Sequence, residues 1–233
     1  MVPAFGPGRS LGLGPGGPES TTTVRVIAGE KGGRRIVAPD GLRTRPTSDR
    51  VREAAFSMLE SAMAERRGGF AGAVVWDLFA GSGALGIEAL SRGAGEATFV
   101  DQSRSAVSAV KENLAKLGYG PGRAQVYCAE VLRWVHGLED EPGSGGGPLR
   151  AEPGGRTPPD LVLADPPYSW KSWPALLRAL APLGPLVLME TGDEPALPEG
   201  WLVQRARRYG GTLVTLTICG TIPDASPAEA GGL

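Results

Sequence analysis

Four residues in the second half of the chain, Asp165-Pro166-Pro167-Tyr168, have the types that chemistry on a planar amino group requires. An amino nitrogen attached to an aromatic ring is a weak nucleophile because its lone pair is delocalised into the ring. A site that acts on it needs acceptors for its N–H groups and a flat wall against the ring. Asp165 and the Pro166 carbonyl can accept, the prolines remove competing donors, and Tyr168 can stack. A tight proline-rich turn without a chemical role is the alternative interpretation.

A glycine loop lies earlier in the chain. Gly81-Ser82-Gly83 and Gly86 match G-x-G-x-x-G directly after a predicted strand, and Asp101 follows the next strand. This pattern fits NAD as well as S-adenosylmethionine. Asp77, in the strand before the glycines, would repel a pyrophosphate but attract the cationic amino group of S-adenosylmethionine. An NAD enzyme also gives the Asp165 to Tyr168 segment no role. The two motifs together predict methyl transfer from S-adenosylmethionine, with S-adenosylhomocysteine as product and no metal.

Acidic residues are predicted at the carboxyl ends of strands, where open α/β sheets bind ligands. We expect Asp101 to accept from the cofactor's ribose hydroxyls and Glu130 to approach its adenine amino group, with helix capping as the alternative role for both. The residues expected to bind the cofactor are Asp77, Phe79, Gly81, Ser82, Gly83, Asp101, Gln102, Glu130, Thr47 and Arg50. Those expected to be catalytic are Asp165, Pro166 and Tyr168.

Basic residues form two clusters, although the net charge is only -1. The first is expected to bind RNA phosphates through Arg25, Arg34, Arg35, Arg43, Arg45 and Arg52. Solvated charge on exposed turns is the alternative for this cluster. For the second cluster, Arg205, Arg207 and Arg208, solvated surface charge is the preferred interpretation.

Apolar strands alternate with helices from residue 74 onward, which predicts an α/β fold. We expect a Rossmann-like, doubly wound, mostly parallel sheet that ends in a C-terminal antiparallel hairpin at 201–205 and 212–218. The predicted parallel strands are 74–78, 98–100, 126–128, 161–164 and 185–189. Residues 23–66 are expected to add a small N-terminal hairpin (24–28 and 34–37) and a helix.

The expected domain is 67–222, with disordered tails at 1–22 and 223–233 and a flexible insertion at 139–159. No stretch reaches the ~20 apolar residues that span a bilayer, and no secretory signal is visible. We therefore expect a cytoplasmic protein. The two cysteines, Cys128 and Cys219, are expected to be buried and to bind no metal.

Longer segments of the chain, from Val24 to Ile218, resemble the RsmD-type ribosomal RNA guanine-N2 methyltransferases, a class I S-adenosylmethionine-dependent family. The matching segments are Arg25-Val-Ile-Ala-Gly29, Arg34-Arg35, Arg45-Pro-Thr-x-Asp-Arg-Val-Arg-Glu53, the run from Asp77 to Arg92 and Asp165-Pro-Pro-Tyr168. The Arg45 to Glu53 segment makes the resemblance specific, because other base-amino methyltransferases share only the glycine loop and the Asp165 motif. The chain departs from the family pattern at Asp101, where Glu is usual, and in the insertion.

The resemblance implies methylation of the exocyclic N2 of one guanine in a loop of 16S rRNA. It implies the small ribosomal subunit, or its late assembly intermediate, as partner. We expect a monomeric enzyme with no membrane partner. A DNA adenine-N6 methyltransferase remains an alternative, although no DNA-reading module is visible. A non-catalytic rRNA-binding assembly factor is the other alternative.

Overall fold

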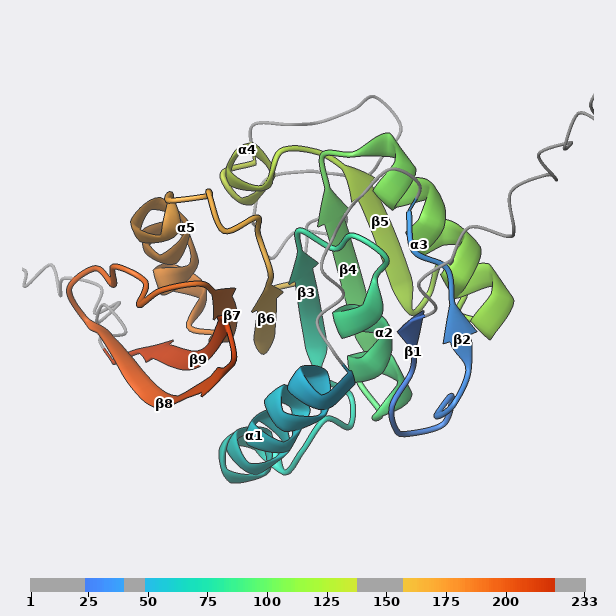
Figure 1. Ribbon diagram of the computed structural model, residues 1–233, viewed down its shortest axis with the longest axis horizontal. Coiled ribbons are helices and arrows are strands. Elements are labelled where there is room, and N and C mark those ends of the chain that lie inside the picture. The colour runs from blue at the N-terminus through green and yellow to red at the C-terminus, as the bar shows by residue number, and fades with distance from the viewer. Residues whose placement is uncertain (1–23, 40–48, 138–156, 221–233) are drawn as a thin grey trace, which may run out of the picture.

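A seven-stranded sheet forms the centre of the protein in the computed structural model, which describes residues 24–39, 49–137 and 157–220 (Figure 1). The strands of this sheet are β3 (Val74–Leu78), β4 (Glu96–Asp101), β5 (Ala124–Cys128), β6 (Leu161–Ala164), β7 (Leu186–Thr191), β8 (Trp201–Tyr209) and β9 (Thr212–Cys219). Their order across the sheet is β5-β4-β3-β6-β7-β9-β8. The strands from β5 to β7 are parallel, and β9 is antiparallel to both of its neighbours. The predicted fold class is confirmed.

The strand order reverses between β3 and β6. Leu78 pairs with Val100 of β4 on one side and with Ala164 of β6 on the other. The next residues along these strands, Phe79, Asp101 and Asp165, therefore lie at one edge of the sheet. Ligands of open α/β sheets bind at such a reversal, at the carboxyl ends of the strands.

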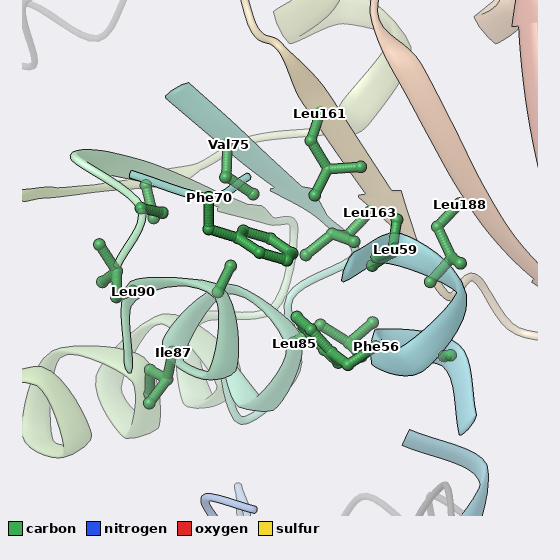
Figure 2. Close-up of a cluster of buried hydrophobic side chains, with 14 of the residues drawn as sticks. Phe56, Leu59, Phe70, Val75, Leu85, Ile87, Leu90, Leu161, Leu163 and Leu188 are labelled. Atoms are coloured by element: carbon green, nitrogen blue, oxygen red, sulfur yellow. The ribbon is translucent and has the colours of Figure 1, made fainter. Parts of the chain in front are cut away.

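Helices cover both faces of the sheet. They are α1 (Asp49–Arg67), α2 (Ala84–Ser91), α3 (Arg104–Leu117), α4 (Val131–Val135) and α5 (Trp173–Leu180). Phe56 and Leu59 of α1 meet Leu85 of α2 and the β6 residues Leu161 and Leu163 on one face (Figure 2). The opposite face packs against side chains of α4 and α5. Burial of these apolar surfaces supplies the main stabilisation of the layers.

Helix α3 has the ends that its sequence predicts. The Ser103 side chain accepts a hydrogen bond from the Ala106 amide, and Gly118 ends the helix with φ of 80°. Glycine reaches this left-handed conformation at low cost. The buried side chains of α3 include Val107, Val110 and Leu114, which follow helical spacing.

The predicted N-terminal hairpin is confirmed, with shorter strands. Its strand β1 (Val24–Arg25) pairs in antiparallel fashion with β2 (Arg35–Ile36). Figure 1 shows it beside α2 and α3, outside the main sheet. Its turn is closed by hydrogen bonds from Val26 N to Arg34 O, 2.9 Å, and from Gly33 N to Val26 O, 2.8 Å.

Several details differ from the sequence-based expectation. The predicted helix 173–183 is an α-helix only to Leu180, and a 3-10 turn (Ala181–Leu183) follows, because Pro182 has no amide hydrogen to continue the α pattern. Strand β8 extends to Tyr209, four residues beyond its expected end. Cys128 is exposed and Cys219 is partly exposed, whereas the sequence predicts that both are buried. The expected tails, and residues 139–156 of the insertion, lie outside the described residues.

Candidate functional site

The glycine loop connects β3 to α2 through three left-handed residues. Phe79, Gly81 and Gly83 have φ of 66°, 54° and 78°. A Cβ on Gly81 would meet no atom within 4 Å, whereas one on Gly83 would lie 3.2 Å from Val110. Gly81 is thus required for its backbone conformation and leaves space beside the loop, while Gly83 is required also for packing.

Gly86, the third glycine of the pattern, is required by close packing in the first turn of α2. A Cβ at this position would lie 2.4 Å from Phe99 Cε1 and 3.0 Å from Asp77 Cβ. The helix therefore approaches β3 and β4 closely. This contact fixes the start of the helix that the loop opens.

Asp101 supports the glycine loop with one carboxylate oxygen and α3 with the other. Its Oδ2 accepts from Gly81 N at 2.9 Å, and its Oδ1 accepts from Ser103 N at 2.8 Å. Each carboxylate oxygen can accept a second hydrogen bond. The capping alternative is therefore realised in part, and the ribose contact stays a prediction.

Asp77 is buried beneath the loop. Its Oδ2 accepts from Gly86 N at 2.8 Å. Burial raises the pKa of Asp77 well above its usual value, and the charges of Asp165 and Asp101 raise it further, although the Gly86 hydrogen bond opposes the shift. These carboxylates, contributed by β3, β4 and the end of β6, act on one another at a single edge of the sheet. Such an arrangement favours a cationic ligand.

The Asp165 motif forms an elbow directly after β6. Asp165 is partly exposed, Pro166 is buried, and Tyr168 is 45% exposed. The Tyr168 hydroxyl lies 2.7 Å from Thr212 Oγ1, and a Cβ on Gly192 would lie 3.4 Å from Tyr168 Cδ2. The tyrosine ring is therefore held by residues at the end of β7 and the start of β9. The sequence analysis did not connect these two strands with the site.

Aromatic contacts join the elbow to the glycine loop. The Phe79 ring lies 5.0 Å from Trp170 at 66°, and Trp170 lies 5.0 Å from Trp173 at 86°. Both are edge-to-face geometries, which favour aromatic pairs. Phe79 keeps a backbone conformation that is unusual for a residue with a side chain, and such conformations persist where their surroundings enforce them. The cofactor loop and the elbow are thus packed as one unit.

The remaining predicted cofactor residues have different surroundings. Glu130 caps α4 by accepting from Leu132 N at 3.1 Å and Arg133 N at 2.9 Å. This is the capping alternative, and the adenine contact stays a prediction. Gln102 and Arg50 are exposed. Thr47 lies outside the described residues.

One residue of the first basic cluster, Arg52, is not placed as the sequence predicts. Arg52 is 1% exposed, and its Nη2 donates to Arg25 O at 2.8 Å and to Asp49 Oδ1 at 2.6 Å. Its predicted role in binding RNA phosphates is wrong, because the guanidinium is enclosed between α1 and the hairpin. Arg25, Arg34 and Arg35 are exposed. Arg43 and Arg45 lie outside the described residues.

Asp49 forms ion pairs with two arginines of this cluster, Arg25 and Arg52. Arg25 Nε lies 2.6 Å from Asp49 Oδ2. Burial acts to raise the pKa of Asp49, but the hydrogen bonds from Arg25 and Arg52 outweigh it and lower the pKa. Two of the arginines counted as RNA ligands are therefore engaged by one carboxylate.

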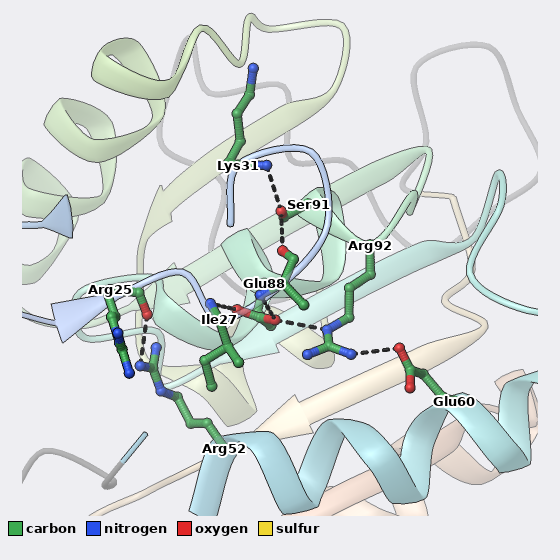
Figure 3. A network of polar contacts seen from close by, with 9 residues as sticks. Arg25, Ile27, Lys31, Arg52, Glu60, Glu88, Ser91 and Arg92 are labelled. Atoms are coloured by element: carbon green, nitrogen blue, oxygen red, sulfur yellow. Dashed lines mark hydrogen bonds and ion pairs between the residues drawn. The ribbon is translucent and has the colours of Figure 1, made fainter. Parts of the chain in front are cut away.

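Polar residues of α2 hold the N-terminal hairpin on the domain (Figure 3). Glu88 is fully buried and accepts from Ile27 N at 2.6 Å and Ala28 N at 3.0 Å. Arg92 Nε contacts the same carboxylate at 2.7 Å. Ser91 Oγ donates to Ala28 O at 2.5 Å. The helix that begins at the glycine loop thus ends in a docking site for the hairpin.

Asn113 of α3 links the hairpin to the glycine loop. Its Oδ1 accepts from Val37 N at 2.8 Å, and its Nδ2 donates to Val37 O and Ser82 O, both at 2.9 Å. The side chain is fully buried. The sequence reasoning missed Glu88 and Asn113, as it missed Thr212. The available signal for the first two was a polar residue on an otherwise apolar helix face.

The described residues show neither a metal-binding group nor a membrane-spanning helix. Among the described residues, no group of His, Cys, Asp and Glu side chains has an arrangement that could hold a metal ion. Within the same ranges, no helix is long and apolar enough to cross a membrane.

Comparison with known proteins finds a family model, "Conserved hypothetical protein 95", that matches residues 24–143. "Putative rRNA methyltransferase YlbH" of Bacillus subtilis is 37% identical over 83% of this chain and 97% of its own length. "Ribosomal RNA small subunit methyltransferase D" of Escherichia coli is 31% identical over 80% of this chain and 85% of its own. A solved structure, "Putative methyltransferase yhhF from Escherichia coli", superposes with a TM-score of 0.65 at 30% identity, covering 84% of this chain and 98% of that one.

Proposed function

Because this chain belongs to the RsmD-type family of ribosomal RNA methyltransferases, we propose that it methylates the exocyclic N2 of one guanine in a loop of 16S rRNA. The methyl donor is S-adenosylmethionine. The observation that carries this proposal is the packing of the glycine loop against the Asp165 elbow at the point where the strand order reverses.

The residues at this edge fit S-adenosylmethionine. The space beside Gly81 admits a ligand close to the backbone, and Asp101 retains acceptor capacity for two ribose hydroxyls. Asp77 lies beneath the loop with its pKa raised by burial and by the charges of Asp165 and Asp101, and a cationic ammonium group bound there would oppose that shift. Glu130 offers further acceptor capacity for the adenine amino group. Thr47, Arg50 and Gln102 remain proposed contacts.

The elbow holds the base. Asp165 and the Pro166 carbonyl accept hydrogen bonds from the guanine N2 amino group, and Tyr168 stacks on the ring. The hydroxyl contact with Thr212 and the packing against Gly192 fix the plane of this wall before the base arrives. Positioning is the main contribution that the protein makes, because it replaces a bimolecular encounter by an oriented one.

The bound donor supplies an electrophilic methyl group on a sulfonium, which is a good leaving group. As N2 bonds to the methyl carbon, the carbon–sulfur bond breaks and its electron pair stays on sulfur. The nitrogen becomes cationic, and the Asp165 carboxylate stabilises that charge. The extra proton becomes acidic and leaves N2 for solvent, so no strong dedicated base is required.

The substrate is an unpaired guanine, because a base in a loop is cheaper to unstack than one in a duplex. The exposed Arg25, Arg34 and Arg35 contact phosphates, which position the RNA without reading its sequence. Arg43 and Arg45 remain proposed phosphate contacts. The choice of target therefore comes from RNA shape. The small ribosomal subunit or its late assembly intermediate is the proposed partner, which implies a cytoplasmic enzyme.

Transfer of a labelled methyl group to small subunits, naked 16S rRNA and duplex DNA tests the function. We expect label on guanine N2 in the rRNA, either in the subunit or naked. Asp165→Ala should lower kcat by about 10²- to 10³-fold, the usual effect of losing one preorganised charge-stabilising group. Its affinity for S-adenosylmethionine should stay within a few-fold of that of the unmodified protein. Glu112→Ala, on the exposed side of α3, is the control. Label on DNA adenine alone, or full activity of Asp165→Ala, refutes the proposal.

A further inference from the structure

Strand β8 carries a second basic surface at the edge of the sheet. All residues from 202 to 208 are exposed, among them Arg205, Arg207 and Arg208, and the strand contains no acidic residue. The sequence alone favoured simple solvated charge for these arginines. The position of Arg208 in the fold gives it another role.

Arg208 lies next to the wall that holds the base. Its Nη1 donates to Gly192 O at 2.8 Å, and Gly192 packs against the Tyr168 ring. On the neighbouring strand, Thr212 contacts the Tyr168 hydroxyl, and the β8–β9 register pairs Tyr209 with Thr212. One glycine therefore separates the Arg208 guanidinium from the proposed stacking surface.

The backbone carbonyl orients Arg208 without consuming its binding capacity. A guanidinium has five N–H donors, and the contact with Gly192 uses one of them. A carbonyl acceptor also leaves the positive charge uncompensated, unlike a carboxylate. An oriented guanidinium of this kind is suited to a phosphate, which it can bind through two parallel hydrogen bonds.

The other two arginines lie on the opposite face of β8 from Arg208, because successive side chains of a strand alternate between its two faces. Arg205 and Arg207, two residues apart, share the face that looks toward α1. Arg205 lies 3.5 Å from Glu65 of α1, and both side chains are exposed, so water and salt weaken that pair. In the first cluster, by contrast, Arg52 is buried and Arg25 lies 2.6 Å from Asp49. More of the arginine charge is accessible on β8 than at those two positions.

We propose that Arg208 binds a phosphate of the RNA strand that flanks the target guanine. The proposal rests on the proposed function. A flipped base leaves its own phosphate and those of its neighbours at the rim of the site, and Arg208 places an oriented guanidinium beside the Tyr168 wall at that rim. The C-terminal hairpin thus binds the RNA strand as well as completing the sheet.

The test compares Arg208→Gln, the β8 variant, with a control that removes one positive charge elsewhere, Arg178→Gln on the exposed side of α5. Affinity for a 16S rRNA fragment is measured from low to high salt. Loss of one phosphate contact should reduce the slope of log K against log salt by about 0.7 for the β8 variant. The control should lose far less. Arg208→Lys, which keeps the charge without the planar fork, should fall between.

Calorimetry with S-adenosylmethionine, thermal unfolding and light scattering complete the design. The β8 variant should match the unmodified protein in all three, while its KM for RNA rises. A slope equal to that of the control overturns the proposal. So does a parallel loss of cofactor affinity or thermal stability, which would make Arg208 a structural tie, or a changed molar mass, which would make β8 a protein interface. If the unmodified protein methylates no rRNA, the proposed function itself fails; if it is active and the slope is unchanged, only the β8 surface fails.

Discussion

Replacing Asn113 by Ala should weaken both the fold and the binding of S-adenosylmethionine. The side chain makes three hydrogen bonds, two to Val37 and one to Ser82. Each is worth about 1 kcal/mol net, and a buried partner left without a hydrogen bond costs about 1–3 kcal/mol. Val37 is only partly buried, so water can replace part of the loss. We expect the free energy of unfolding to fall by about 3 kcal/mol.

The cofactor measurement separates two roles of Asn113. If its bond to the Ser82 carbonyl holds the glycine loop in its binding conformation, calorimetry under native conditions should show a roughly tenfold weaker S-adenosylmethionine affinity, about 1.4 kcal/mol. Asn113→Asp keeps the acceptor for Val37 N but turns a carboxylate oxygen toward two carbonyls, so it should be at least as damaging. Lys111→Ala, an exposed change in the same helix, is the control.

Denaturant unfolding and calorimetry together can refute this reasoning. A loss of stability below about 1 kcal/mol would mean that the three hydrogen bonds are replaced by water. A large loss of stability with unchanged cofactor affinity would mean that Asn113 holds the hairpin but does not position the loop.

Asp77→Asn should raise stability at neutral pH. Burial raises the pKa of Asp77, so its ionisation destabilises the folded state increasingly as the pH rises above 3.8, and an amide avoids this cost. Denaturant unfolding should show the advantage shrinking as the pH falls toward 3.8, while calorimetry shows weaker cofactor binding; a less stable variant at pH 7 contradicts the argument. Gly86→Ala should cost about 2 kcal/mol in the same unfolding assay, because its Cβ would lie 2.4 Å from Phe99, whereas Gly120→Ala, with no neighbour within 4 Å, should cost little. Tyr168→Ala should lower kcat/KM for RNA by about 10- to 100-fold through lost stacking, and Tyr168→Phe, which keeps the ring, by only a few-fold; equal losses would show that the ring is not the wall.

Much of the fold could be predicted because its strands are short apolar runs with turn residues between them. β6 occupies the predicted residues without change, and the caps of α3 follow from Ser103 and Gly118. These features depend on neighbours in sequence. The glycine loop and Asp101 belong to the same category, since a strand, a loop and the next strand define their geometry.

The features that sequence reasoning missed depend on contacts between distant positions. Asn113 bonds to Val37, 76 residues away, and Tyr168 contacts Thr212, 44 residues away. Neither partner has a sequence pattern that points to the other. Arg52 was misjudged for the same reason, because a cation is buried only where the fold supplies acceptors, here Asp49 and the Arg25 carbonyl.

The docking of the hairpin on α2 sets a boundary for any attempt to dissect or recombine this enzyme. A truncated chain beginning at β3 would expose Glu88, a carboxylate that accepts hydrogen bonds from Ile27 N and Ala28 N. It would also remove Val37, the hairpin partner of the Asn113 side chain that contacts the Ser82 carbonyl. The smallest autonomous unit therefore includes the N-terminal hairpin as well as the sheet. A chimaera that carries the N-terminal hairpin of another protein would also need matching residues at positions 88 and 91 of α2 and 113 of α3, which contact the hairpin.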